Sequence, residues 1–389
     1  MRIVVGLCLT IFLVLSLTLY LGKLSTLNNN TILNKYEVCD KFQDLGSKQK
    51  CWEDLIEETL GNEGLESAFN LVDYLYTNEP IFASDCHGFT HQLGVKAYQL
   101  FSQNQNIKLT SKASYCGFGF YHAFMESLLH ATGDLNQARQ FCDYVGKQAS
   151  QNELSRLSCF HGIGHGLLED VPNPTVKSDA QTIIKRPLEI CVQLSKSEVE
   201  EYRCTSGVFN VLAIYYQNQK TGLKIQNNDP YLICQNQNKK YPKKACYDQM
   251  NSLVLSLAAG NLSLATRFAE KITDDEFADE AIHGIAGAYG QTKVDKINYD
   301  DVVKICQNIQ PRLTLQCLQG FLLGMLEGGK PGEEYIEGRK FCTSNLLREE
   351  EKISCFNDLV WNTSVTNPKK LAEICNGLEQ KYKQNCNAN

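Results

Sequence analysis

Residues 142–170 read CDYVGKQASQNELSRLSCFHGIGHGLLED and contain the pattern that predicts the fold. Cys142 and Cys159 stand 17 residues apart, and the second cysteine opens an apolar helical stretch. If one cysteine lies late in a helix and the other lies early in the returning helix, their Cα atoms approach disulfide range. A bridge that closes a loop of this size contributes about 3 kcal/mol in the loop-entropy description. The segment therefore predicts a helical hairpin that is closed by a disulfide.

The same pattern recurs along the chain, and the helices that begin at the second cysteines start about every 40 residues, a period typical of helical-hairpin solenoids. The cysteines pair at separations of 11 to 17 residues, as Cys39–Cys51, Cys142–Cys159, Cys191–Cys204, Cys234–Cys246, Cys306–Cys317, Cys342–Cys355 and Cys375–Cys386. A glycine recurs three residues after a cysteine, at Gly119, Gly162, Gly207 and Gly320, with Gly284 in a segment that resembles a repeat without its bridge. Because glycine weakens a helix, its recurrence indicates close helix packing.

In hairpin period and small-residue packing, residues 39–386 resemble tetratricopeptide and Sel1-like solenoids, although the disulfides depart from those families. The resemblance implies a fold and carries no functional residues. The fold class that we expect is all-α, a disulfide-stapled helical-hairpin repeat (α-solenoid) that follows an N-terminal transmembrane signal anchor. We expect an anchor over residues 1–23, a linker over 24–38, histidine-rich repeats over 39–175 and cysteine-paired repeats over 176–389.

The anchor is predicted from Ile3 to Gly22, about 20 residues without a charge, which is enough to span a bilayer. Arg2 precedes this run, so the positive-inside rule places the rest of the chain outside the cytoplasm. The run ends without an A-x-A pattern, which favours an uncleaved anchor, with a cleaved signal peptide as the alternative. Both interpretations predict an extracytoplasmic protein, attached to the membrane in the first case.

Cysteine usage and charge agree with this location. The chain has 17 cysteines, and apart from Cys8 in the predicted anchor they form an even set, as expected where disulfides persist. No C-x-x-C occurs, which argues against zinc ribbons, thioredoxin-type motifs and covalently attached haem. Sequons begin at Asn29, Asn261 and Asn362 and permit glycosylation in a suitable host. The net charge of −6 argues against a nucleic-acid partner.

Six of the seven histidines lie between residues 87 and 165. Two stretches share the pattern H-G-x-x-H, which places two imidazoles on one helix face. When the segments are aligned on their cysteines, His122 matches His165 and Glu126 matches Glu169. The candidate metal ligands on three inward-facing helices are His87, His91, His122, Glu126, His161, His165 and Glu169. These ligands suit zinc, copper or non-haem iron, and two histidines can also hold a haem.

Packing is the alternative explanation for these side chains. Glu327 also lies ten residues after its cysteine, in a repeat without histidine, which weakens the interpretation of the two glutamates as ligands. We expect His130 and His283 to be ordinary surface or groove residues. Cys86 and Cys116, 30 residues apart and each expected early in a helix, form either a longer-range bridge or thiolate ligands for copper or zinc.

The leading function is metal or haem binding by an anchored extracytoplasmic solenoid, in support of a redox or hydrolytic reaction. The alternative is a non-catalytic scaffold that docks a partner protein, for which the histidine-poor repeats from Cys191 onward are suited. The chain contains no G-x-S-x-G, P-loop, G-x-G-x-x-G or H-E-x-x-H motif. Convergence of the histidines in the fold distinguishes the two functions.

Overall fold

The computed structural model describes residues 38–103, 107–147, 153–169, 179–218, 222–291, 298–383 and 386. These residues form helices joined by turns and contain no strand, so the all-helical prediction is confirmed for them. The predicted anchor and the predicted domain border at residues 175–176 lie outside the described residues. None of the described helices has the length and apolarity needed to cross a bilayer.

The chain divides into two compact units, Met1–Leu71 and Val72–Asn389. The described part of the first unit contains α2 (Leu45–Glu63) and the first half of α3 (Leu65–Asn78). Trp52, Ile56 and Leu60 are buried at a spacing of four residues and form the apolar stripe of α2. This unit also holds the bridge between Cys39 and Cys51.

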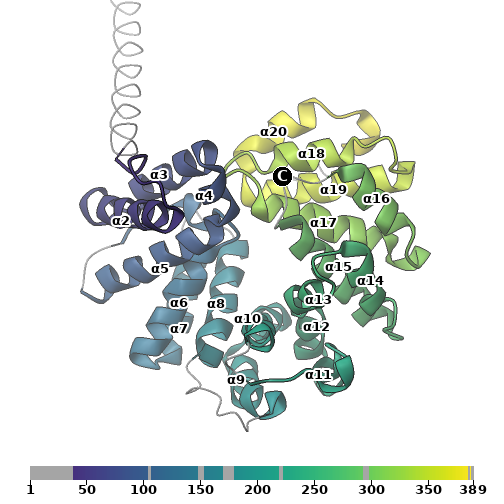
Figure 1. Ribbon diagram of the computed structural model, residues 1–389, viewed down its shortest axis with the longest axis horizontal. Coiled ribbons are helices and arrows are strands. Elements are labelled where there is room, and N and C mark those ends of the chain that lie inside the picture. Colours follow the sequence, from purple (N-terminus) through teal and green to yellow (C-terminus); the bar gives the residue numbers. More distant parts are fainter. Residues whose placement is uncertain are drawn as a thin grey trace, which may run out of the picture. The chain divides into compact units, whose positions relative to one another are not determined.

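The second unit is a succession of helices that lie side by side in chain order (Figure 1). After the end of α3 the α-helices are α4 (Pro80–Ser84), α5 (Cys86–Ser102), α6 (Gly119–Thr132), α7 (Leu135–Lys147), α8 (Glu153–Glu169), α9 (Ala180–Leu194), α10 (Glu198–Gln217), α11 (Leu232–Gln235), α12 (Lys240–Gln249), α13 (Asn251–Leu257), α14 (Leu262–Ala269), α15 (Asp275–Gln291), α16 (Tyr299–Gln307), α17 (Thr314–Gly328), α18 (Tyr335–Cys342), α19 (Glu349–Thr366) and α20 (Pro368–Asn376). Short 3₁₀ turns are η1 (Ser111–Ser114), η3 (Gln226–Asn228), η4 (Pro311–Leu313) and η5 (Gln380–Tyr382). One series of helices packs in the order α5, α6, α8, α10, α12, α15, α17 and α19, and most of the remaining helices form the other arms of the hairpins.

The predicted disulfides are confirmed. All seven short-range pairs are bridged, and Cys86 is joined to Cys116 with a Cα–Cα distance of 5.5 Å. The bridge excludes the thiolate-ligand alternative for that pair. Within α7 and α8, Cys142 and Cys159 occupy the two arms of a hairpin, as predicted, whereas the hairpin of α14 and α15 has no bridge.

The repeated glycines lie where neighbouring inner helices approach most closely. A Cβ atom on Gly207 would lie 2.0 Å from the carbonyl oxygen of His161, and one on Gly320 would lie 2.2 Å from that of His283. Such distances are prohibited for any larger residue unless the helices separate. The glycines therefore allow adjacent inner helices to approach closely, so that side chains from neighbouring helices can contact one another on the side that lines the cavity.

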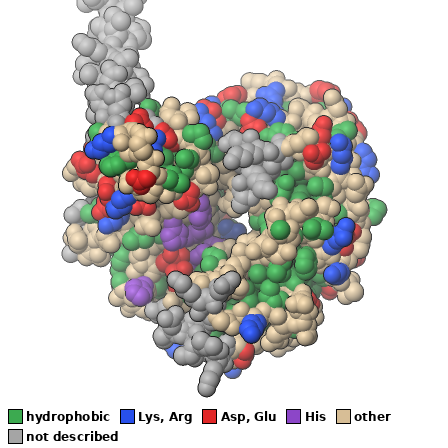
Figure 2. Space-filling model, viewed as in Figure 1, with side chains coloured by type: hydrophobic (Ala, Val, Ile, Leu, Met, Phe, Trp, Pro, Cys, Tyr) green, Lys and Arg blue, Asp and Glu red, His purple; other side chains and the backbone are tan. Residues whose placement is uncertain are grey.

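The beginning of the second unit contacts the end of α17. The Tyr76 hydroxyl, late in α3, donates a hydrogen bond of 2.8 Å to the carbonyl oxygen of Gly328 at the end of α17. The inner helices line a cavity of about 860 Å³. Figure 2 shows histidine side chains gathered beside this hollow.

Candidate metal centre

Three consecutive inner helices bring the predicted ligands together. Helix α5 carries His87 and His91, α6 carries His122 and Glu126, and α8 carries His161, His165 and Glu169. The ring centroid of His122 lies 5.3 Å from that of His87, 4.8 Å from that of His161 and 5.0 Å from that of His165. The structure therefore joins histidines from three separate helices in one cluster.

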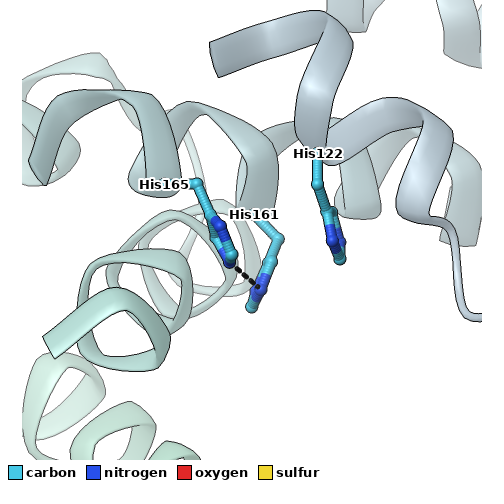
Figure 3. A group of neighbouring side chains, drawn as sticks. All are labelled: His122, His161 and His165. Carbon is cyan, nitrogen blue, oxygen red and sulfur yellow. Dashed lines mark hydrogen bonds between the residues drawn. The ribbon is translucent and has the colours of Figure 1, made fainter. Parts of the chain in front are cut away.

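The tightest group consists of His122, His161 and His165 (Figure 3). One ring nitrogen of each lies within 4.8 Å of the others, and all three side chains are largely buried. The Nδ1 atom of His122 is buried and has no hydrogen-bond partner among the described residues. A buried polar nitrogen without a partner carries a desolvation cost, and a bound cation is one ligand that would relieve it.

Hydrogen bonds at Nδ1 favour one tautomer in two of these rings. The Ser206 hydroxyl donates its proton to the carbonyl oxygen of Arg203 over 2.7 Å, so it accepts from Nδ1–H of His161, also over 2.7 Å. Nδ1–H of His165 donates to Oε1 of Glu126 over 2.9 Å. In the neutral state both Nε2 atoms then bear lone pairs, because an imidazole has only one N–H.

These two Nε2 atoms face each other at 3.1 Å (Figure 3). In this tautomer two lone pairs meet at this distance, and a proton or a metal ion between them would offset their repulsion. Zinc–nitrogen bonds of about 2.05 Å place two nitrogens of a tetrahedral site about 3.3 Å apart. The separation of His161 and His165 is close to that value without any movement of the helix.

Glu126 lies between two histidines from different helices. Its Oε1 accepts from His165, and its Oε2 lies 3.2 Å from Nε2 of His91. Burial opposes ionisation of this carboxyl, but the two hydrogen bonds outweigh it and lower the pKa of Glu126 to about 2. Burial likewise opposes charge on His91, yet Glu126 raises the pKa of that imidazole. Glu126 is therefore a fixed negative charge that orients His165.

A second group combines Glu126, His165 and Glu169, whose ligand atoms also lie within 4.8 Å of one another. Glu169 is the last residue of α8 and is exposed. The pKa of Glu169 is raised, mainly because neighbouring protein atoms desolvate its carboxyl group and also because Glu126 carries a negative charge. The two groups share His165.

His87 is oriented by the loop that precedes α6. Its Nδ1–H donates to the carbonyl oxygen of Cys116 over 2.9 Å, which leaves Nε2 with a lone pair. Cys116, Gly117 and Phe118 have successive φ values of 55°, 66° and 62°. The expectation that Cys116 lies early in a helix is thus wrong: these left-handed residues delay the start of α6 to Gly119.

Three imidazoles of this cluster, those of His87, His122 and His161, have lowered pKa values and are neutral bases. Burial is the main reason that the pKa values of His122 and His161 lie well below the usual range, and the neighbouring histidines lower them further. Burial also lowers the pKa of His87. Metal ions bind the neutral form of imidazole, so competition with protons is reduced at these positions.

Two further histidines lie outside the group. His130 is exposed near the end of α6, and His283 on α15 lines the cavity, so the groove interpretation of His283 is confirmed. The prediction from sequence did not identify Ser206 or the Cys116 carbonyl as partners of the histidines. Ser206 lies two residues after Cys204, just as His161 lies two residues after Cys159. This equivalent position in adjacent repeats could have predicted that the two side chains are neighbours.

Comparison with known proteins finds no family model, no curated protein and no solved structure that matches the chain.

Proposed function

We propose that this protein binds a transition-metal ion through His122, His161 and His165. The observation that carries the proposal is the pair of Nε2 atoms 3.1 Å apart, on two rings whose Nδ1 atoms each have a separate oxygen partner. The buried, unpartnered Nδ1 of His122 supports it from a different helix. Neutral imidazoles of this number suit zinc, copper or iron.

The surroundings of the histidines resemble the outer layer of a metal site. Ligating histidines commonly donate their second N–H to a carboxylate, a carbonyl or another oxygen, which fixes the tautomer and the ring orientation. Glu126 has this role for His165, Ser206 for His161 and the Cys116 carbonyl for His87. Glu126 is accordingly an orienting carboxylate in this proposal, and His87, His91 and Glu169 are residues beside the ion.

We favour an ion over a haem. A haem held by two imidazoles places its porphyrin plane between them. The rings of His122, His161 and His165 contact one another with centroids 4.8 to 5.0 Å apart, which leaves no slot for a macrocycle between them.

The site has the composition of a catalytic metal centre. Three protein ligands leave at least one coordination position, whereas structural zinc sites are usually closed by four. His122 and His161 line the cavity, so that position is accessible to a small molecule. We further propose that the protein functions outside the cytoplasm, attached through residues 1–23, where its disulfides persist. Redox and hydrolytic chemistry are both compatible with this ligand set.

Elemental analysis of the purified full chain tests the proposal. We expect about one equivalent of zinc, copper or iron in the wild-type protein and none in the His122→Ala/His165→Ala double variant. The matched control is His130→Ala/His283→Ala, which removes two histidines outside the group and should retain the ion. Equal metal content in the two double variants, or a metal-free wild type after reconstitution with each ion, contradicts the proposal and leaves the docking scaffold as the function.

A further inference from the structure

Arg203 on α10 is a cation with no counterion among the residues that the structure describes. It lines the cavity and is only partly accessible to solvent, and its Nε is buried with no hydrogen-bond partner. Among the described residues no carboxylate lies within ion-pair distance of its guanidinium. By contrast, Arg139 and Arg156 both pair with the buried Glu200. An unpaired guanidinium inside a protein is costly unless a ligand supplies the anion.

The carboxyl groups of the same cavity have other partners. Asp248 accepts a hydrogen bond of 3.1 Å from the Tyr202 hydroxyl and another from the side chain of Gln249. Glu280 forms an ion pair of 2.7 Å with Lys244. The cavity therefore contains acidic side chains, but they do not neutralise Arg203.

Glu327 is the remaining carboxyl group in this wall. Burial raises its pKa to about 7, and the positive charge of Arg203 is the main influence that opposes this rise. At neutral pH a substantial fraction of Glu327 is thus protonated and able to donate a hydrogen bond. None of the described residues donates a hydrogen bond to its carboxyl oxygens.

Arg203 is adjacent to the histidine cluster. Its own carbonyl oxygen accepts from Ser206, which holds His161, and its charge contributes to the lowered pKa of His161. The cavity that Arg203 shares with His87, His122 and His161 measures about 860 Å³, within the range of small-molecule sites.

We propose that the cavity binds a small molecule that carries an oxyanion group, a carboxylate or a phosphate, which accepts hydrogen bonds from Arg203. The molecule extends from Arg203 toward His122 and His161, with Glu327 as a further hydrogen-bonding group on the opposite helix. The contact with the ion rests on the proposed function, whereas the contact with Arg203 does not. Guanidinium groups favour carboxylates and phosphates because their paired N–H groups match two oxygens.

The test measures anion binding separately from metal binding. The full chain is loaded with Co²⁺, and its visible spectrum is followed during titration with inorganic phosphate in one arm and acetate in the other. We expect at least one anion to change the spectrum, and Arg203→Met to weaken its affinity about tenfold or more without change in Co²⁺ binding. Arg203→Lys should retain part of the affinity, and Arg186→Met, which removes an exposed charge on α9, should retain all of it.

The two proposals fail in different ways. If neither anion binds the wild type, or if Arg203→Met binds as tightly as the wild type, the oxyanion site is excluded while Co²⁺ binding stands. If Co²⁺ does not bind, the same anions are tested on the metal-free chain by equilibrium dialysis. Binding that depends on Arg203 then supports the oxyanion site and contradicts the metal centre, and its absence excludes both. The arm that binds more tightly identifies a phosphate or a carboxylate as the group recognised.

Discussion

Helices α8 and α15 occupy equivalent places in the helical array but differ in the chemistry that they present. His161 is followed by Gly162, and His283 is followed by Gly284, and both glycines contact the backbone of the preceding inner helix. Four residues after its first histidine α8 has His165, whereas α15 has Gly287. The scaffold is therefore common to both helices, and a second imidazole on the same face distinguishes a cluster from a solitary histidine.

The neighbouring helices complete the contrast. Helix α6 supplies His122 and Glu126 to α8, and α10 supplies Ser206. The corresponding neighbours of α15 bring Asp248 and Leu323 to the cavity and no further histidine among the described residues. The proposed ligand set and its hydrogen-bond partners thus come from three adjacent inner helices, and the helices around α15 offer no equivalent set among the described residues.

The largest expected effect separates the two helices directly. His161→Ala should lower the affinity for the ion at least about a thousandfold, or about 4 kcal/mol, because one of three ligands is lost. His283→Ala, at the equivalent position, should leave the affinity unchanged. Competition with a chromophoric chelator measures both. Equal losses of metal affinity in the two variants would contradict the assignment of the ion to the histidines of α8.

The next effect concerns the orientation of a ligand. Glu126→Gln keeps the size of the side chain but removes the charge that holds His165, and we expect 10- to 100-fold weaker metal binding, about 1.4 to 2.7 kcal/mol. The same chelator competition applies. The matched control is Glu327→Gln, at the equivalent position of α17, which should not change the affinity for the ion. An unchanged affinity in Glu126→Gln would mean that this carboxylate is a packing residue.

A smaller effect tests whether close helix packing positions the histidines. A Cβ atom on Gly207 would lie 2.0 Å from the backbone of α8, while one on Gly287 would lie 3.3 Å from that of α17. We expect Gly207→Ala to reduce the free energy of unfolding by about 1.5 kcal/mol and Gly287→Ala by less than about 1 kcal/mol. Urea unfolding measures both values, and the reverse order would contradict this account of the array.

The smallest effect is the response to pH. Imidazoles whose pKa is lowered remain neutral as pH falls through 6.5, so His122 and His161 should bind the ion over a wider range than exposed histidines. We expect less than about a fivefold loss of affinity between pH 7.5 and 6.0, whereas three ordinary imidazoles would lose about fiftyfold. Isothermal titration at the two pH values decides between these outcomes.

Much of the fold was predictable because its signals are local. The seven short-range cysteine pairs and the glycines that follow four of the cysteines are local patterns, and the i, i+4 spacing of His161 and His165 lies within about one helix turn. The left-handed loop at Cys116 was missed because only glycine favours φ > 0, and here Cys116 and Phe118 share that conformation.

The site was predictable only in part. The convergence of the histidines follows from the register of the repeats, but the roles of individual residues depend on contacts between distant segments. Glu126 was predicted as a ligand, and its position between His91 and His165 instead favours an orienting role. The isolation of Arg203 depends on where the cavity's carboxylates find partners, which a sequence pattern does not reveal.

The central claim is that one ion lies among three imidazoles from α6 and α8. A crystal structure of the metal-loaded protein, with anomalous diffraction collected at the absorption edge of the bound element, tests it most directly. The account predicts one strong peak about 2.0 to 2.1 Å from a ring nitrogen of each of His122, His161 and His165. A peak at any other position, or fully loaded crystals without a peak among these three rings, would contradict it.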